Sequence, residues 1–342
     1  MKKIRTGIVG LGRLGRQHAE NAAFRIPHLE LQAVCSVIPE EVEDFQKTWQ
    51  IPEGYVDFDE MIEKSDLQAV LIASPSGYHC RQIEKALAAG LHVFCEKPLG
   101  ISLDECRQAE RAVEAYPDQI FMLGFMRRFD PSYQYAKKKL EEGAIGKPIL
   151  FRGYSIDPES AIEGAIRFGP TSGGQFLDMA VHDIDLARWF LQAEARSVYA
   201  VGGCYLHPEF ASFNDGDNVS ALMQFENDAM AFFVAGRTAP HGYHIETEII
   251  GTHGTLRIGG TPRANQVEIL DQHGVRQECA QNFLERFEQA YLNELQTFAQ
   301  CILTGEKPDV SVYDGTRATI IAEAATRSFR DQELVWIDVR NA

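Results

Sequence analysis

The fold is decided by the segment IRTGIVGLGRLG, residues 4–15. Its first half, residues 4–9, has the apolar and β-branched character of a buried strand. Its second half is a G-x-G-x-x-G turn, Gly10-Leu11-Gly12-Arg13-Leu14-Gly15, which opens a helix predicted to run to about residue 24. Glycines at these positions allow a tight turn, a close backbone approach to a pyrophosphate, and close packing of the helix on the strand. The segment therefore predicts a dinucleotide site.

Strand and helix patterns alternate after this turn. The predicted strands are 29–34, 69–73, 92–95 and 120–124, and the predicted helices are 40–49, 78–89 and 103–115. Such alternation is typical of a doubly wound parallel sheet. We therefore expect an N-terminal Rossmann domain over residues 1–125.

Ligands of such sheets bind at the carboxyl ends of the strands, where Ser74-Pro75 and Glu96-Lys97-Pro98 lie. We expect Ser74, Pro75, Glu96 and the nearby His79 to contact the cofactor. Lys97 follows an apolar strand, so its ammonium group is predicted to hold and polarise a substrate oxygen. The alternative is a solvated lysine at a strand end.

The second strand ends in Cys35-Ser36, where many dinucleotide sites carry an acid that binds the adenosine ribose. No lysine or arginine occupies this position, although NADP selection commonly uses a cation. The sequence thus favours NAD, with Ser36 as a ribose contact. NADP stays open, and the alternative interpretation of Cys35-Ser36 is a plain strand end.

Ionisable residues interrupt an otherwise apolar helical segment at residues 173–189. In a continuous α-helix, Asp178, His182 and Asp185 share one face. A histidine one turn from a carboxylate is suited to general base chemistry. A core histidine satisfied by the aspartate is the alternative. No metal is expected, because further ligands at matching spacing are not evident.

The rest of the chain, residues 126–342, is predicted to form an α+β domain with a mostly antiparallel sheet. Its expected strands are 149–156, 197–205, 219–225, 230–235, 245–250, 255–258 and 267–270, and its expected helices are 130–143, 283–303 and 313–330. The last two helices could pack back on the first domain, so the boundary near residue 125 is a simplification. Alternating residues near Leu222 leave few charges on one sheet face, which favours self-association.

The composition excludes several classes of function. Lys and Arg total 33 against 49 Asp and Glu, so the net charge is 33 − 49 = −16, which argues against nucleic acid or an anionic membrane as a partner. The sequence contains no apolar run long enough to span a membrane. The seven cysteines form no C-x-x-C pair and predict reduced thiols in a cytoplasmic protein.

Several motifs together resemble the Gfo/Idh/MocA family of sugar and polyol oxidoreductases, nearly from end to end. They are the glycine-rich turn, Glu96-Lys97-Pro98, and the segments GFMRRFD (124–130), GYSIDP (153–158), DMAVHDID (178–185) and APHGY (239–243). The segment at 124–130 is the most specific and is similar to the inositol dehydrogenase branch.

The resemblance implies NAD-dependent oxidation of scyllo-inositol to scyllo-inosose. It implies that Lys97, Asp178 and His182 are catalytic, and that Arg127, Asp157 and Tyr243 bind substrate, together with a cis bond before Pro98 and a homotetramer. His241, beside a glycine that lets backbone approach a ligand, is a further candidate for the substrate pocket. The alternatives are another polyol, such as myo-inositol, and a regulator that senses NAD(H) without turnover.

Overall fold

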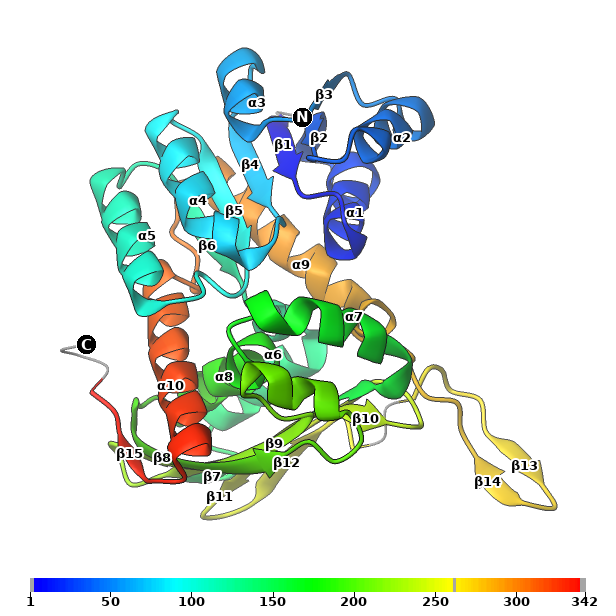
Figure 1. Ribbon diagram of the computed structural model, residues 1–342, viewed down its shortest axis with the longest axis vertical. Helices are drawn as coiled ribbons and strands as arrows, with labels where there is room; N and C mark the ends of the chain where they lie inside the picture. The colour runs from blue at the N-terminus through cyan, green and yellow to red at the C-terminus, as the bar shows by residue number, and fades with distance from the viewer. Residues whose placement is uncertain (1–2, 261–262, 339–342) are drawn as a thin grey trace. The chain divides into compact units, whose positions relative to one another are not determined.

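The computed structural model describes residues 3–260 and 263–338 of the chain (Figure 1). The chain folds into two compact units. Unit 1 contains residues 1–129 and 289–319, and unit 2 contains residues 130–288 and 320–342. The long helices α9 (Phe283–Thr304) and α10 (Val312–Asp331) contribute residues to both units.

Unit 1 is built on a six-stranded parallel sheet with the strand order β3-β2-β1-β4-β5-β6. This order is that of a Rossmann fold and confirms the predicted doubly wound class. The strands are β1 (Ile4–Val9), β2 (Leu29–Cys35), β3 (Glu53–Tyr55), β4 (Ala69–Ile72), β5 (His92–Glu96) and β6 (Phe121–Gly124). The helices that connect them are α1 (Arg13–Glu20), α2 (Pro39–Trp49), α3 (Phe58–Lys64), α4 (His79–Ala88) and α5 (Leu103–Ala115).

Capping residues explain where several helices begin. The side chain of Asp57 accepts a hydrogen bond from Glu60 N at the start of α3, and Ser102 does the same for Glu105 N at the start of α5. Asp130 caps α6 (Pro131–Glu141), whose first residue is a proline. Among the described helices, none combines the length and hydropathy that a membrane span requires.

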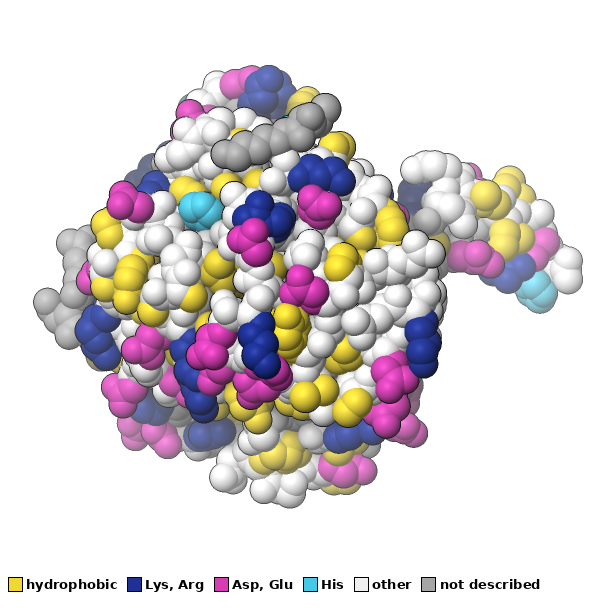
Figure 2. Space-filling model, turned by 90° about the horizontal axis from the view of Figure 1, so that it is seen from above, with side chains coloured by type: hydrophobic (Ala, Val, Ile, Leu, Met, Phe, Trp, Pro, Cys, Tyr) yellow, Lys and Arg dark blue, Asp and Glu magenta, His cyan; other side chains and the backbone are white. Residues whose placement is uncertain are grey.

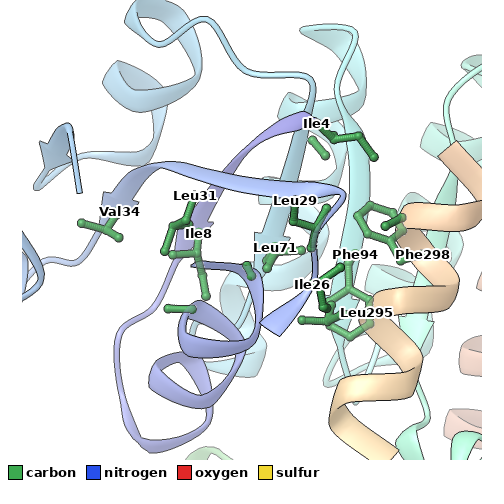
Figure 3. Packing of buried hydrophobic residues seen from close by; sticks show 14 of the residues in the cluster. Ile4, Ile8, Ile26, Leu29, Leu31, Val34, Leu71, Phe94, Leu295 and Phe298 are labelled. Carbon is green, nitrogen blue, oxygen red and sulfur yellow. The ribbon is translucent and has the colours of Figure 1, made fainter. Parts of the chain in front are cut away.

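The core of unit 1 includes the C-terminal part of the chain. Figure 3 shows Leu295 and Phe298 of α9 beside Phe94 of β5 and Ile26, all of them buried. The rings of Phe94 and Phe298 are 5.9 Å apart. Helix α9 therefore completes the apolar core behind the strands that carry the predicted dinucleotide site.

Unit 2 is built on a seven-stranded sheet with the order β12-β11-β7-β10-β9-β8-β15. Its strands pair antiparallel except for β7 and β10, which run parallel. They are β7 (Pro148–Pro158), β8 (Ala195–Gly203), β9 (Asn218–Phe225), β10 (Met230–Ala239), β11 (His244–Gly251), β12 (Thr255–Ile258) and β15 (Val335–Trp336). Helices α6, α7 (Ile162–Phe168) and α8 (Val181–Leu191) lie on one side of it (Figure 1). The predicted mostly antiparallel sheet is confirmed.

The other side of this sheet exposes apolar side chains on its central strands. Cross-strand register brings together Tyr199 and Val201 of β8, Leu222 of β9, and Met230 and Phe232 of β10. These five side chains are between 36% and 54% exposed. We call them the outer apolar face.

A two-stranded hairpin, β13 (Ile269–Asp271) and β14 (Gly274–Arg276), extends from unit 2 and belongs to a separate sheet. Part of it had been predicted as a strand at 267–270. Figure 2 shows hydrophobic side chains on the hairpin, and it also shows acidic and basic side chains intermixed over the face in view. Leu270 and Val275, which are paired across the hairpin, are 72% and 65% exposed.

Candidate functional site

The glycine-rich turn has the stereochemistry that a dinucleotide site requires. Gly10 has a φ of +89°, and a Cβ there would lie 2.5 Å from the Ala73 carbonyl oxygen. A Cβ at Gly15 would lie 1.8 Å from the Gly10 oxygen, so only glycine allows α1 to pack this closely. In contrast, a Cβ at Gly12 would meet no described atom within 4 Å. Gly10 and Gly15 are thus required by the tight turn and by the close helix packing, and the space beside Gly12 is compatible with the predicted approach of a pyrophosphate.

The N-terminus of α1 is open to an anion. Gly12 is the N-cap residue, and no described side chain caps the helix. The first amide groups of a helix have no partner within the helix, and they carry the positive end of its dipole. Leu11, Arg13 and Leu14, the other predicted cofactor contacts, lie in or beside this turn. The turn therefore has the geometry expected of a site for the pyrophosphate of a dinucleotide.

An acid that the sequence analysis missed lies beside Ser36. The Ser36 hydroxyl donates to Glu41 Oε2 over 2.5 Å and accepts from the Ile38 amide, and Ser36 is 6% exposed. Glu41 is half-buried in the first turn of α2. A carboxylate is therefore present at the end of β2 after all, delivered by the next helix. The signal was available as the acidic first turn, Glu40-Glu41, after Pro39.

His79 joins the loops that follow β4 and β5. Its Nδ1 is 2.7 Å from the Pro98 carbonyl oxygen, and its Nε2 is 2.9 Å from the Ser74 carbonyl oxygen. Burial lowers the pKa of His79, against the opposite effect of these two carbonyls. The ring is 1% exposed, and both of its nitrogens face backbone carbonyl groups. His79 therefore connects the two loops that follow β4 and β5. Ser74 in turn donates to Gln82, and the Pro75 carbonyl accepts from the Tyr78 amide.

Glu96 and Lys97 follow one another at the carboxyl end of β5. The Glu96 carboxylate points into unit 1, where Oε1 is 2.6 Å from His18 Nε2 and Oε2 accepts from the Lys97 amide over 3.2 Å. Glu96 is 5% exposed, whereas Lys97 is half-buried. The Lys97–Pro98 peptide bond is cis, which confirms that expectation.

Arg127 lies in a short 3₁₀ segment, Met126–Phe129, directly after β6. It is 2% exposed, and its neighbour Arg128 forms an ion pair of 3.1 Å with Asp314. Both arginines belong to unit 1. The motif at 124–130 therefore lies at the carboxyl edge of the parallel sheet, with Glu96 and Lys97 one strand away.

The predicted continuous α-helix over residues 173–189 is interrupted. Residues Phe176–Ala180 form a π-helical turn, and the α-helix α8 begins only at Val181. Asp178 lies in the π turn and His182 in the first turn of α8, so the regular spacing assumed for Asp178, His182 and Asp185 was wrong. Such π turns are frequent at functional sites because they redirect side chains.

A buried arginine that the sequence analysis did not name organises this region of unit 2. Arg237 of β10 forms ion pairs with Asp178 and, over 3.2 Å, with Asp157. Its Nε donates to Gln175 Oε1 over 2.9 Å. Burial alone would lower the pKa of Arg237, but the charges of Asp178 and Asp157 outweigh it and raise that pKa. The only hint in the sequence was a lone cation in the apolar strand MAFFVAGRTA.

Helix α8 is held against β7 next to these residues. Asp183 is fully buried and accepts a hydrogen bond of 2.6 Å from the Ser155 hydroxyl. A Cβ at Gly153 would lie 2.6 Å from Asp183 Oδ1, so a glycine is needed for this approach. His182, the preceding residue, is 8% exposed. Residues Asp157, Asp178 and His182 thus all belong to unit 2, where Arg237 brings the two aspartates together.

The segment at 239–243 differs from its prediction in one respect. Gly242 has a φ of +128°, and a Cβ there would lie 2.5 Å from the Ala280 carbonyl oxygen. The close backbone approach that requires glycine here is to residue 280 of the chain itself, and the contact of this segment with a ligand stays a prediction. Tyr243 is 6% exposed with its ring against Phe287, whereas His241 is exposed and bonded to His244 over 3.1 Å.

Comparisons with known proteins define the class. Residues 4–125 match the family described as "Oxidoreductase family, NAD-binding Rossmann fold", and residues 133–257 match the "GFO/IDH/MocA C-terminal domain". The chain therefore belongs to the Gfo/Idh/MocA family of oxidoreductases, as its motifs indicated, and its N-terminal unit is an NAD-binding domain. The cofactor predicted from the sequence is thereby supported.

Individual relatives extend over the whole chain. It is 37% identical to scyllo-inositol 2-dehydrogenase (NAD(+)) of Bacillus subtilis, over 99% of this chain and 98% of the relative. The structure of scyllo-inositol dehydrogenase from Lactobacillus casei with NAD(H) and scyllo-inositol superposes with a TM-score of 0.95 at 44% identity, covering 98% and 99% of the two chains. Myo-inositol 2-dehydrogenase from Lactobacillus plantarum superposes with a TM-score of 0.97 at 37% identity, covering 98% and 100%.

Proposed function

We propose that the protein is an inositol dehydrogenase that oxidises scyllo-inositol to scyllo-inosose with NAD. The observation that carries this proposal is the full-length similarity to scyllo-inositol dehydrogenases, at 37% and 44% identity, in a chain that retains Lys97, Asp178 and His182. A regulator that only senses NAD(H) would have no use for this set of a cation, a carboxylate and a base.

The roles of the three residues follow from their chemistry. His182 takes the hydroxyl proton as general base. Asp178, which Arg237 holds in place, stabilises the imidazolium that forms, and Lys97 polarises the reacting oxygen. NAD, when bound, supplies the acceptor for the hydride that leaves the same carbon.

The remaining polar residues bind the other hydroxyl groups of the ring. Arg127, Asp157 and Tyr243 are the proposed contacts, with His241 at the edge of the pocket. A polyol offers donors and acceptors in fixed directions, and buried polar groups discriminate strongly when one of them loses its partner. The neutral substrate also suits a chain of net charge −16, which would repel an anionic one.

Initial rates with scyllo- and myo-inositol, each with NAD and NADP, test the proposal. We expect the highest kcat/KM for scyllo-inositol with NAD. A higher value for myo-inositol would reassign the substrate within the same reaction. If no polyol in a wider panel supports the formation of NADH, the protein is not the proposed enzyme, and a regulator that senses NAD(H) is favoured.

We further infer a homotetramer that covers the outer apolar face with a second copy of the chain. The five side chains form a compact apolar patch, and beside it Arg152 makes an ion pair of 2.6 Å with Glu246. Burial of such a patch against its own symmetric copy is the common route to closed oligomers.

The seven free thiols fit a reducing cytoplasm.

Light scattering on the purified protein tests the assembly. Leu222→Glu places a charge in the middle of the outer apolar face, so we expect dissociation into smaller species, because an unpaired charge would be buried at the interface. Leu270→Glu on the exposed hairpin is the matched control and should leave the mass unchanged. A tetramer that persists in the Leu222→Glu variant would contradict this interface.

A further inference from the structure

Unit 1 contains a buried cluster of three ionisable side chains that the proposed reaction does not use. His18 comes from α1, Glu96 from the end of β5, and Glu294 from α9. Their exposed fractions are 0%, 5% and 0%. The cluster therefore joins three segments of unit 1: the helix that follows the glycine-rich turn, the strand end that precedes Lys97, and the returning helix α9.

The contacts within the cluster are unequal. His18 Nε2 is 2.6 Å from Glu96 Oε1, which is a short direct hydrogen bond, and the other oxygen of Glu96 accepts from the Lys97 amide. Glu294 Oε1 is 4.0 Å from His18 Nε2. Among the described residues, neither oxygen of Glu294 has a hydrogen-bond partner.

Two ionised carboxylates cannot both persist here without compensation. The free energy of burying one ion amounts to several kcal/mol, and the two carboxylates would in addition repel each other. Burial, and then the charge of Glu96, raise the pKa of Glu294 well above its usual range. Glu96 has two donors and Glu294 has none among the described groups, and this difference agrees with the direction of the pKa shift at Glu294.

The geometry favours a proton over a metal ion as the compensating charge. The three ligand atoms lie within 4.8 Å of one another, which makes a cation site conceivable. However, His18 Nε2 and Glu96 Oε1 are only 2.6 Å apart, a separation at which the pair shares a hydrogen and not an ion. Coordination distances of about 2.0–2.2 Å to a zinc ion would hold two ligands farther apart than this.

We propose that His18 and Glu96 are positioning residues for Lys97, and that Glu294 closes the cluster as a neutral carboxyl group. The hydrogen bond from His18 fixes the Glu96 carboxylate, which in turn holds the Lys97 amide. Rigid support from residues behind a site is what keeps a catalytic group within a fraction of an ångström of its productive place. This inference rests on the proposed role of Lys97.

The packing around the cluster supports a fixed geometry. The His18 ring packs edge-on against Phe94 at 5.2 Å and against Tyr291 at 5.7 Å. A Cβ at Gly124 of β6 would lie 3.1 Å from the Glu96 carboxyl carbon, so the glycine allows this carboxylate to pack close to the β6 backbone. The titratable groups around the cluster include Lys97 beside Glu96, His79 of α4 and Cys95 of β5, on both of which the charge of Glu96 acts, and Tyr291 of α9.

Two substitutions of one residue test the positioning role. His18→Phe keeps a ring between Phe94 and Tyr291 but removes the donor, whereas His18→Gln retains an N–H donor. We expect His18→Phe to speed deuterium exchange at the Lys97 amide at least tenfold and to lower kcat by a similar factor, with KM for scyllo-inositol within about twofold. His18→Gln should restore both quantities to within about threefold of the wild-type values.

Several outcomes would overturn the proposal. One is that His18→Phe leaves both kcat and deuterium exchange at the Lys97 amide unchanged. Another is that His18→Phe and His18→Gln are impaired equally, as a merely structural role of His18 predicts. If His18→Phe does not fold, the folded His18→Gln protein decides by its exchange rate at the Lys97 amide. Should Lys97→Ala retain full kcat, the proposed role of Lys97 fails, but exchange at this amide in the His18 variants still reports whether the turn is held.

The neutral state of Glu294 has its own test. We expect Glu294→Gln, which resembles a protonated carboxyl group in shape, to change kcat and the exchange rate at pH 7 by less than about twofold. A loss of tenfold or more would overturn that part of the proposal. Elemental analysis showing one divalent ion per chain, released on His18→Gln substitution, would replace the proton with a metal site.

Discussion

Two clusters of ionisable residues, a half-buried one in unit 2 and a buried one in unit 1, compensate their carboxylates in different ways. In unit 2, Arg237 is paired with both Asp178 and Asp157, so one fixed cation stands between two carboxylates. In unit 1, His18 forms a hydrogen bond with Glu96, whereas Glu294 lies 4.0 Å from His18. The comparison teaches that a buried carboxylate persists as an anion where a donor faces it and takes up a proton where none does.

The difference also separates their proposed tasks. Asp178 must be negative to stabilise an imidazolium, and an arginine, which is charged at every working pH, holds it so. Glu294 needs no charge for its proposed task, which is to fill the buried space beside His18 and Glu96. Each substitution below changes one member of this comparison, and the expected effects decrease in size.

Removal of the cation in unit 2 should have the largest effect on stability. Arg237→Met removes the cation shared by Asp178 and Asp157. Breaking a fully buried pair costs about 3–5 kcal/mol of unfolding free energy, and the loss should be smaller here because the two carboxylates are 18% and 26% exposed. Arg257→Met is the matched control, because Arg257 pairs with Glu248 at the surface. Because Arg257 is exposed to water, we expect its replacement to change the unfolding free energy little.

Urea unfolding at pH 7 measures both variants. Equal losses in the Arg237→Met and Arg257→Met proteins would show that the buried arginine has no special role. A folded Arg237→Met protein should also have a lower kcat, because Asp178 is no longer held in place.

The proton on Glu294 should make stability depend on pH. An unfolded glutamate ionises near pH 4.3, while the pKa of Glu294 in the folded protein is higher, so between these values the folded state holds one more proton. This contribution is fully present below pH 4 and is lost as the pH rises, by up to about 1.4 kcal/mol per pH unit.

Glu294→Gln removes this slope. The unfolding free energy of the wild-type protein relative to the variant should therefore fall as the pH rises above about 4.3, until the pH passes the raised pKa of folded Glu294. Glu306→Gln, at an exposed position that follows α9, is the control and should run parallel to the wild type. Parallel curves for Glu294→Gln as well would mean that Glu294 is ionised.

A smaller effect is expected at Glu41, a half-buried acid whose partner is a neutral hydroxyl group. Its negative charge beside Ser36 at the end of β2 should repel the 2′-phosphate of NADP. Glu41→Gln keeps a hydrogen-bond acceptor for Ser36 and removes the charge. We expect the ratio of kcat/KM for NAD over NADP to fall several-fold, and an unchanged ratio would return cofactor selection to other residues.

Local patterns predicted most of the fold. The G-x-G-x-x-G turn and the alternating segments up to Gly124 identified the parallel sheet, because strand, turn and helix there each follow from neighbouring residues. The short elements β3 and α3 were not anticipated, since three and seven residues carry too little periodicity. The π turn at 176–180 was missed because its sequence fits a regular helix equally well.

The residues that depend on tertiary contacts could not be found in this way. Arg237 approaches Asp157 and Asp178 across separations of 80 and 59 residues, and His18 meets Glu96 across 78. Glu41 was overlooked because a helix, and not the strand end itself, supplies the acid. For Arg237 and His18 the partner is chosen by the packing of two elements that are distant in sequence, whereas Glu41 and Ser36 are only five residues apart.

The central claim is that His182 removes the hydroxyl proton during hydride transfer. The most direct measurement mixes the enzyme and NAD with scyllo-inositol and follows the first turnover by NADH absorbance, in the wild type, in His182→Ala, and in His273→Ala on the exposed hairpin as control. We predict that His182→Ala slows this step by about 10²–10⁴-fold with NADH affinity unchanged, while His273→Ala matches the wild type. A first turnover of His182→Ala at the wild-type rate would contradict the account.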